Sequence, residues 1–184
     1  MSFPNVIYGN YGDEKQVFTA AMPTTAEKAN GYLEKGDKRL GTKLILPDGR
    51  EFRLGKASAT AIVQGKLYQQ AAVSAADTMM TASHIVAATT AVGATSITIT
   101  TSGTTAIAAG AFDDGYIYTA SSVGTGIGWT YKIKSAASAA AGSASCVVSL
   151  AAGEKVQVAT EGGTTKVGMR QNEFYNVLLT INNI

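Results

Sequence analysis

The feature that most constrains this fold is a period-two alternation of apolar and polar side chains. Ile97 and Ile99 alternate with Ser96, Thr98 and Thr100. Since successive side chains of a β-strand point to opposite faces, this period indicates a strand buried on one face. The same alternation predicts further strands at 115–120, 129–134, 145–150, 155–159 and 175–181.

Clusters rich in glycine, aspartate and asparagine separate the alternating segments, as at 113–115, 124–126 and 161–163. Several short strands at this spacing predict a mainly β protein, built as an antiparallel β-sandwich or barrel that is jelly-roll-like. Residues 135–145 consist of Ser, Ala and Gly. Alanine propensity permits a short helix there, but the serines and Gly142 favour a loop.

The first part of the chain differs from the rest. Residues 1–23 show no clear period and predict an extended N-terminal arm. The sequence Thr24-Thr25-Ala26-Glu27 resembles a capping box, which predicts a short helix ending before Gly36, although an internal Asn-Gly pair argues against it. We therefore expect an arm with a possible short helix at 1–40 and a β-rich domain at 41–184.

The segment 42–54 predicts a β-hairpin of defined register. Pro47 presets φ for the turn, and Gly49 takes the left-handed position that closes it. A three-residue loop with a bulge places Leu44 opposite Phe52, whereas a two-residue turn would place it opposite Arg53. The first register buries an apolar pair, so we predict that one.

Chemically reactive side chains are scarce. Residues 67–131 contain no Lys or Arg, and the acids among them are Asp77, Asp113 and Asp114. The chain has one histidine, His84, and one cysteine, Cys146. A single cysteine excludes an internal disulfide, and its apolar neighbours predict a buried thiol. One histidine cannot build a zinc cluster, so we predict that His84 is a surface or packing residue. Because reactive side chains are scarce in the whole chain, we also predict that the protein is not an enzyme.

Three segments approach ligand-binding motifs but depart from them. Residues 36–43 nearly spell a phosphate-binding loop, but the final pair is inverted and a strand follows. Residues 124–128 resemble a dinucleotide loop, but Trp129 stands where the last glycine belongs, which favours a hairpin turn. Asp113-Asp114-Gly115 suits a turn better than a calcium loop. We expect no cofactor, no metal ion and no small-molecule substrate.

The net charge of +2 lacks the basic stripe of a nucleic-acid-binding protein. No stretch approaches the ~20 apolar residues that span a bilayer, and the first residues lack the features of a secretory signal. We therefore expect neither nucleic acid nor membrane as a partner. The charge-poor middle of the chain is either solvated by its hydroxyls or covered in part by a protein partner.

Short motifs between residues 40 and 160 resemble small structural proteins of tailed-bacteriophage virions. In those proteins a short hairpin is followed by an Ala-rich link, then by a Gly-Lys-Leu-x-Gln motif, and later by a glycine-aromatic stretch. The corresponding residues here are Asp48-Gly49-Arg50-Glu51-Phe52-Arg53, Ala59-Thr60-Ala61, Gly65-Lys66-Leu67-Tyr68-Gln69, the segment 91–99, and Gly115-Tyr116-Ile117-Tyr118 with Gly124-Thr125-Gly126.

The resemblance implies a capsid decoration, or cement, protein: a β-rich and often trimeric protein that clamps neighbouring major capsid subunits from outside. A chain of this kind is made in the host cytoplasm and ends on the outer surface of the virion capsid. A trimer would join several weak contacts and gain avidity. The arm at 1–40 would order on a neighbouring subunit.

The densest basic group supplies the candidate contacts with an acidic capsid surface. An ordinary solvated hairpin explains the same charges. The group comprises Lys38, Arg39, Lys43, Arg50, Arg53 and Lys56.

Three other functions stay open. The chain could be another phage part, such as a tail, neck or fibre-base subunit. It could be a carbohydrate-binding β-domain that uses Tyr116, Tyr118 or Trp129. If it were an enzyme, a hydrolase acting through carboxylates is the chemistry that its composition allows most easily.

Overall fold

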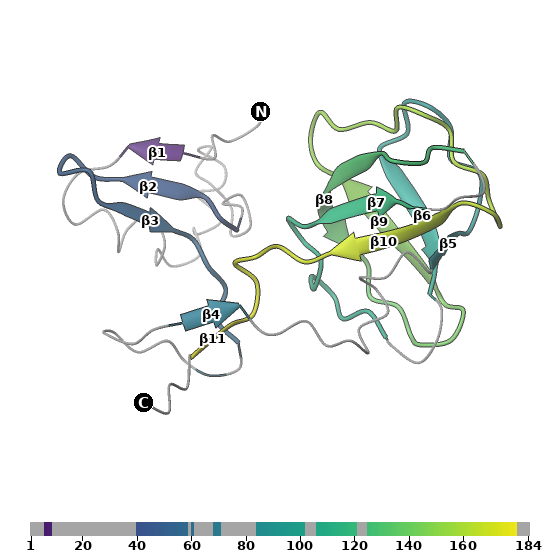
Figure 1. The fold of residues 1–184 in the computed structure, drawn as a ribbon. Helices are drawn as coiled ribbons and strands as arrows, with labels where there is room; N and C mark the ends of the chain where they lie inside the picture. The colour runs from purple at the N-terminus through teal and green to yellow at the C-terminus, as the bar shows by residue number, and fades with distance from the viewer. Residues whose placement is uncertain are drawn as a thin grey trace, which may run out of the picture. The chain divides into compact units, whose positions relative to one another are not determined.

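The computed structural model describes residues 6–8, 40–58, 60, 68–70, 84–101, 106–120 and 125–179 of the 184-residue chain. The regular elements in these ranges are all β-strands (Figure 1). Most of the long strands form a closed antiparallel barrel, which confirms the predicted mainly β class and the barrel alternative. The short helix predicted to begin at Thr24 and to end before Gly36 lies outside the described residues.

The chain divides into two units. The first unit combines residues 1–71 with residues 173–184, and the barrel unit comprises residues 72–172. This division does not fall after residue 40, where the sequence suggested one, because a strand of the predicted arm pairs with a strand of the predicted β-rich domain. The barrel unit is therefore inserted into the first unit along the sequence.

In the first unit, β1 (Val6–Tyr8) pairs in parallel with β2 (Lys43–Ile45), which pairs antiparallel with β3 (Glu51–Arg53). Leu44 lies opposite Phe52, so the predicted hairpin register is confirmed. The backbone N–H of Leu46 donates to the carbonyl of Arg50 at 3.0 Å, and Gly49 has φ 82°. The left-handed glycine closes the three-residue loop, as its sequence predicts.

A second pair of strands completes the described part of the first unit. β4 (Tyr68–Gln70) pairs antiparallel with β11 (Val177–Leu179). The N–H of Val177 donates to the Lys56 carbonyl at 2.9 Å, and the N–H of Lys56 donates to the Phe174 carbonyl at 2.8 Å. Segments from the two ends of the sequence thus share backbone hydrogen bonds. β11 confirms the middle of the strand predicted at 175–181, but residues 175–176 form a bend before it, and residues 180–181 lie outside the described residues.

The barrel consists of six strands: β5 (His84–Val86), β6 (Ser96–Thr100), β7 (Tyr116–Thr119), β8 (Thr130–Ala136), β9 (Ser145–Leu150) and β10 (Lys166–Arg170). Their order around the barrel is β10-β5-β6-β9-β8-β7, and β7 pairs with β10 to close it. β7, β8 and β9 are consecutive neighbours, with β6 beside β9 and β10 beside β7. This order gives two overlapping Greek keys.

The alternation that predicted the strands decides which side chains fill the barrel. Ile97 and Ile99 are fully buried, while Ser96, Thr98 and Thr100 face outward and are partly exposed. The inward side chains of the six strands form one apolar core, whose burial is the main favourable term in folding. The fully or nearly fully buried members include Val86, Ile97, Ile99, Ile117, Tyr131, Ile133, Cys146, Val148, Val167 and Met169.

The structure shows that one predicted strand is wrong, and it decides between the two alternatives left for another segment. The strand predicted at 155–159 is not formed, because this segment belongs to the loop between β9 and β10. Val156 is buried there by bonding to the β5–β6 loop, with its N–H donating to the Ala94 carbonyl at 2.9 Å. The segment 135–145 begins as the end of β8 and continues into a turn, so the loop favoured over a helix is confirmed.

Two glycines allow the barrel to close between β7 and β10. A Cβ at Gly168 would lie 2.5 Å from Cζ of Tyr118, whose ring crosses this position from the neighbouring strand. A Cβ at Gly115, just before β7, would overlap the backbone carbonyl oxygen of Arg170. The close approach of backbone therefore requires glycine at position 115, whereas a side chain at position 168 would require the end of the Tyr118 ring to move aside.

We predict that Gly115→Ala lowers the free energy of unfolding by about 2–3 kcal/mol, because the new methyl group meets backbone that cannot move aside. Gly128→Ala is the control. Gly128 has φ 82° and nothing within 4 Å of an added Cβ, so it should cost only about 1 kcal/mol of left-handed strain. Urea unfolding measures both, and equal losses would contradict the steric explanation.

Candidate interaction surfaces of the barrel

The two reactive side chains singled out from the sequence are both inside the barrel. Cys146 is fully buried, as predicted, and its thiol donates to the Ala137 carbonyl at 3.1 Å. Burial raises the pKa of the Cys146 thiol, which keeps it protonated and unreactive. His84 is fully buried on β5, so it is a packing residue and not a surface residue.

The acidic turn before β7 has a structural role. Asp114 adopts φ 58°, and Oδ1 of Asp113 accepts a hydrogen bond from the Ala136 N–H at 3.1 Å. These contacts tie the turn to the end of β8. In the described ranges, no three His, Cys, Asp or Glu side chains gather in a group that could hold a metal ion.

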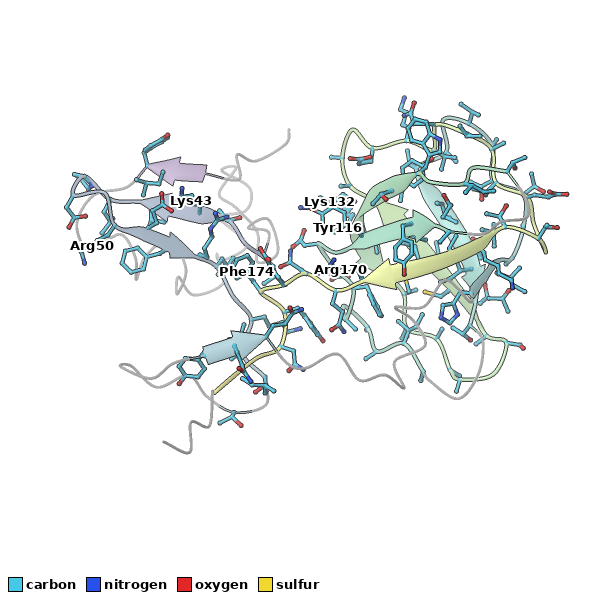
Figure 2. The ribbon with its side chains drawn as sticks, viewed as in Figure 1. Lys43, Arg50, Tyr116, Lys132, Arg170 and Phe174 are labelled. Carbon is cyan, nitrogen blue, oxygen red and sulfur yellow. The ribbon has the colours of Figure 1, made fainter. Side chains whose placement is uncertain are left out.

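The predicted basic contacts on the β2–β3 hairpin have partners within the first unit. Lys43 forms an ion pair with Glu51, and Nε of Arg50 lies 2.7 Å from Oδ2 of Asp48 (Figure 2). The hydrogen bond from the Arg50 side chain lowers the pKa of Asp48. Both pairs lie at the surface, where such ion pairs add little stability.

Two further members of the basic group, Arg53 and Lys56, pack on aromatic rings. Nη1 of Arg53 donates to the Gly41 carbonyl at 3.1 Å, and its guanidinium lies 5.9 Å from the centre of the Phe174 ring. Nζ of Lys56 lies 4.8 Å from the centre of the Tyr175 ring. Lys38 and Arg39 lie outside the described residues. Contact between this group and an acidic capsid surface stays a prediction.

A second basic group lies on the barrel wall. Tyr116 on β7 pairs with Lys132 on β8 on one side and with Arg170 on β10 on the other. The three side chains form a row across adjacent strands, which we call the basic–aromatic row (Figure 2). Nζ of Lys132 lies 5.3 Å from the centre of the Tyr116 ring, which is 42% exposed. This is a cation–π geometry at the surface.

The wall around the row is positively charged. Residues 72–172 contain five Lys or Arg, and four of them lie on β8 and β10: Lys132, Lys134, Lys166 and Arg170. The strands β7, β8 and β10 carry no acidic residue. Among the described residues, none of the four cations has a carboxylate within ion-pair distance.

Sequence analysis found parts of this row but not the row itself. The alternation correctly placed Tyr116 and Tyr118 on one face and the lysines of β8 on the face opposite Tyr131. It gave no sign that β10 lies beside β7, because that pairing joins segments far apart in the sequence. The strand β10 itself was not predicted.

A different surface lies at one end of the barrel. The β5–β6, β7–β8 and β9–β10 connections all lie there, because the strands alternate in direction around the barrel. The described parts of these loops display large apolar side chains to solvent: Val92, Ile127, Trp129 and Val158. We call these four residues the apolar loop end.

Hydrogen bonds between backbone groups, and one from a threonine hydroxyl, join the three loops to one another. Thr90 and Thr160 exchange two bonds, of 3.1 and 3.0 Å, and the Gly93 N–H donates to the Val156 carbonyl at 2.8 Å. The Thr165 hydroxyl donates to the Thr125 carbonyl at 3.1 Å. The exposed apolar groups are thus held on a fixed framework, which reduces the entropy lost on binding a partner.

Thr119 at the end of β7 fixes the turn that carries Ile127 and Trp129. Its hydroxyl donates to the Gly126 carbonyl and accepts a hydrogen bond from the Trp129 N–H at 3.1 Å. The Trp129 ring stacks on Tyr131, with ring centres 6.4 Å apart and planes 9° apart. Trp129, which is 42% exposed, therefore belongs to the loop end and not to the wall that carries Tyr116.

We predict that Thr119→Val lowers the free energy of unfolding by roughly 1–3 kcal/mol, because it leaves the Gly126 carbonyl and the Trp129 N–H without their buried partner. Thr119→Ser keeps the hydroxyl and should therefore avoid most of that loss of stability. Trp129 is the single tryptophan of the chain, so its fluorescence follows the turn during urea unfolding. Equal destabilisation by both variants would contradict the assigned role of the hydroxyl.

Within the part of the chain that the structure describes, no helix has the length and hydropathy needed to cross a bilayer. Comparisons of the chain with protein-family models, with curated proteins and with solved structures found no match.

Proposed function

We propose that this chain is a non-enzymatic virion structural protein, which binds the outside of a tailed-phage capsid and stabilises contacts between major capsid subunits. On this proposal it acts as a decoration, or cement, protein, and several copies, most simply a homo-trimer, engage the capsid together. The proposal rests on the resemblance of its motifs and on the surfaces of the barrel.

The observation that carries the proposal is the apolar loop end. Val92, Ile127 and Trp129 expose 64%, 48% and 42% of their surface on loops that are bonded to one another. Exposed apolar side chains grouped on a rigid framework are typical of a surface that contacts another protein. A closed barrel also offers no strand edge for pairing, so its partners must meet loops or walls.

The motifs that resemble virion proteins occupy defined positions in the fold. The Asp48–Arg53 motif forms the turn and second strand of the β2–β3 hairpin. The segment 91–99 forms the end of the β5–β6 loop and most of β6, and Gly115–Tyr118 opens β7. Two of the three therefore contribute to the two barrel surfaces described above, which links the resemblance to the proposed mode of binding.

A carbohydrate-binding domain is the second candidate, because Tyr116 and Trp129 are each 42% exposed. Sugar rings stack on exposed aromatic faces of this kind. Trp129 lies at the loop end and Tyr116 on the wall, so the two rings do not form one platform. A glycan array would support this candidate only if Tyr116→Ala or Trp129→Ala abolished a binding signal.

The location of the chain in the virion tests the proposal directly. Cryo-electron microscopy of virions should show density for the barrel on the outer capsid shell, over the seams between major capsid subunits. Density confined to the tail, neck or fibre base would support another phage structural role. Virions without any density for this chain would contradict both.

The apolar loop end allows a matched pair of variants. We predict that Val92→Asp weakens binding to capsids assembled without this chain by about tenfold, because it places a charge in a desolvated contact. Val147→Asp is the control, since Val147 is 46% exposed on the wall at β9 and not on a loop. Co-sedimentation measures both, and equal binding by the two variants would contradict the role of the loop end.

A further inference from the structure

We infer that the basic–aromatic row of Arg170, Tyr116 and Lys132 is a second contact surface, which binds an acidic segment of a protein partner. This inference rests on the proposed function, which supplies the partner: a capsid subunit with an acidic surface segment. The row thereby adds an electrostatic contact to the apolar contact of the loop end.

The pairing of the strands sets the spacing of the row. Arg170 and Lys132 each lie in register with Tyr116, on the two strands that flank β7. Neighbouring strands are about 4.8 Å apart, so the two cations are anchored about 10 Å apart with an aromatic ring between them. Because Nζ of Lys132 lies over the Tyr116 ring, 5.3 Å from its centre, the complementary segment presents one carboxylate beside this ring and a second one near Arg170.

The charges of the row are available to a partner. Lys132 contacts the face of Tyr116 rather than a carboxylate, and Arg170 is exposed at the end of β10. In the described part of the chain neither has an ion-pair partner, in contrast to Lys43 and Arg50 on the hairpin. Guanidinium and ammonium groups without a local counter-charge favour an acidic partner and speed its approach.

The composition of the barrel unit favours a protein segment over a nucleic acid. Residues 72–172 contain five basic and five acidic residues, so the unit has no net charge. Proteins that bind nucleic acid without sequence preference neutralise many phosphates along a continuous basic track. Two cations flanking one tyrosine instead match a short segment with two acidic side chains, and tyrosine and arginine are enriched where proteins meet.

Two residues of the row lie away from the apolar loop end. β7 runs from Tyr116 toward the β7–β8 loop, and β10 runs from the β9–β10 loop toward Arg170. Tyr116 and Arg170 are therefore near the end of the barrel opposite the loops, whereas Lys132 lies beside the β9–β10 loop, where its carbonyl accepts a hydrogen bond from the Ala151 N–H at 2.8 Å. The row and the apolar loop end are thus different surfaces of one barrel, and together they allow it to contact two places on a capsid, as the stabilisation of a seam requires.

Co-sedimentation with capsids assembled without this chain tests the inference. The charge-reversal variants Lys132→Glu and Arg170→Glu should each weaken binding by about tenfold, and the double variant by more. Lys134→Glu is the matched control, because Lys134 is an exposed cation on β8 that is not in register with Tyr116 and does not lie on the loops of the apolar loop end. It should bind within about twofold of the original chain, and thermal melting should show that all variants are folded.

Two further comparisons test the chemistry of the row. Tyr116→Phe keeps the ring and should bind as the original chain does, whereas Tyr116→Ala should weaken binding. Raising the salt concentration should weaken the original chain more than the variant with both Lys132→Gln and Arg170→Gln, because that variant has lost the charges that salt screens.

The outcomes separate the two proposals. If the unaltered chain fails to sediment with capsids, the proposed function is wrong and this inference falls with it. If the unaltered chain sediments but the double charge-reversal variant sediments equally well, only the row is wrong. Titration with a single-stranded oligonucleotide and with polygalacturonate covers other acidic polymers, and row-dependent binding to either that exceeds binding to capsids would overturn the assignment to a protein partner.

Discussion

The pairing of β10 with both β7 and β5 is the constraint on which the rest of the barrel depends. It joins four residue pairs to β7 and two to β5, and it turns a chain of neighbouring strands into a closed cylinder. Closure at this seam requires the small size of Gly115, because backbone occupies the space of a side chain there, and Gly168 leaves room for the Tyr118 ring. The apolar core, the grouping of three loops and the basic–aromatic row all follow from this closure.

Closure also determines how such a protein can recognise a partner. Every strand of the barrel has its backbone groups satisfied by two neighbours, so recognition depends on side chains of the wall and the loops. The loops supply apolar area on a fixed framework, and the wall supplies charge flanking an aromatic ring. The first kind of contact contributes mainly affinity, and the second contributes orientation and association rate.

Much of the local structure could be predicted from the sequence, because it depends on neighbours along the chain. The register of the hairpin followed from Pro47 and Gly49, and the inward faces of β6, β8 and β9 followed from alternation. β10 was missed because it has only two inward apolar residues, Val167 and Met169, with a glycine between them, and 155–159 was wrongly assigned because Val156 is buried by a loop rather than a sheet. The row depends on long-range pairing, which no local pattern encodes.

The insertion of the barrel between β4 and β11 affects the order in which the two units are completed during translation. All six barrel strands leave the ribosome before β11, so the barrel can close while the first unit still lacks the partner of β4. Until then β4 exposes an unsatisfied edge, which a neighbouring nascent chain could occupy. Rapid closure of the inserted barrel would shorten the flexible chain between β4 and β11, which lowers the entropy cost of pairing these two strands.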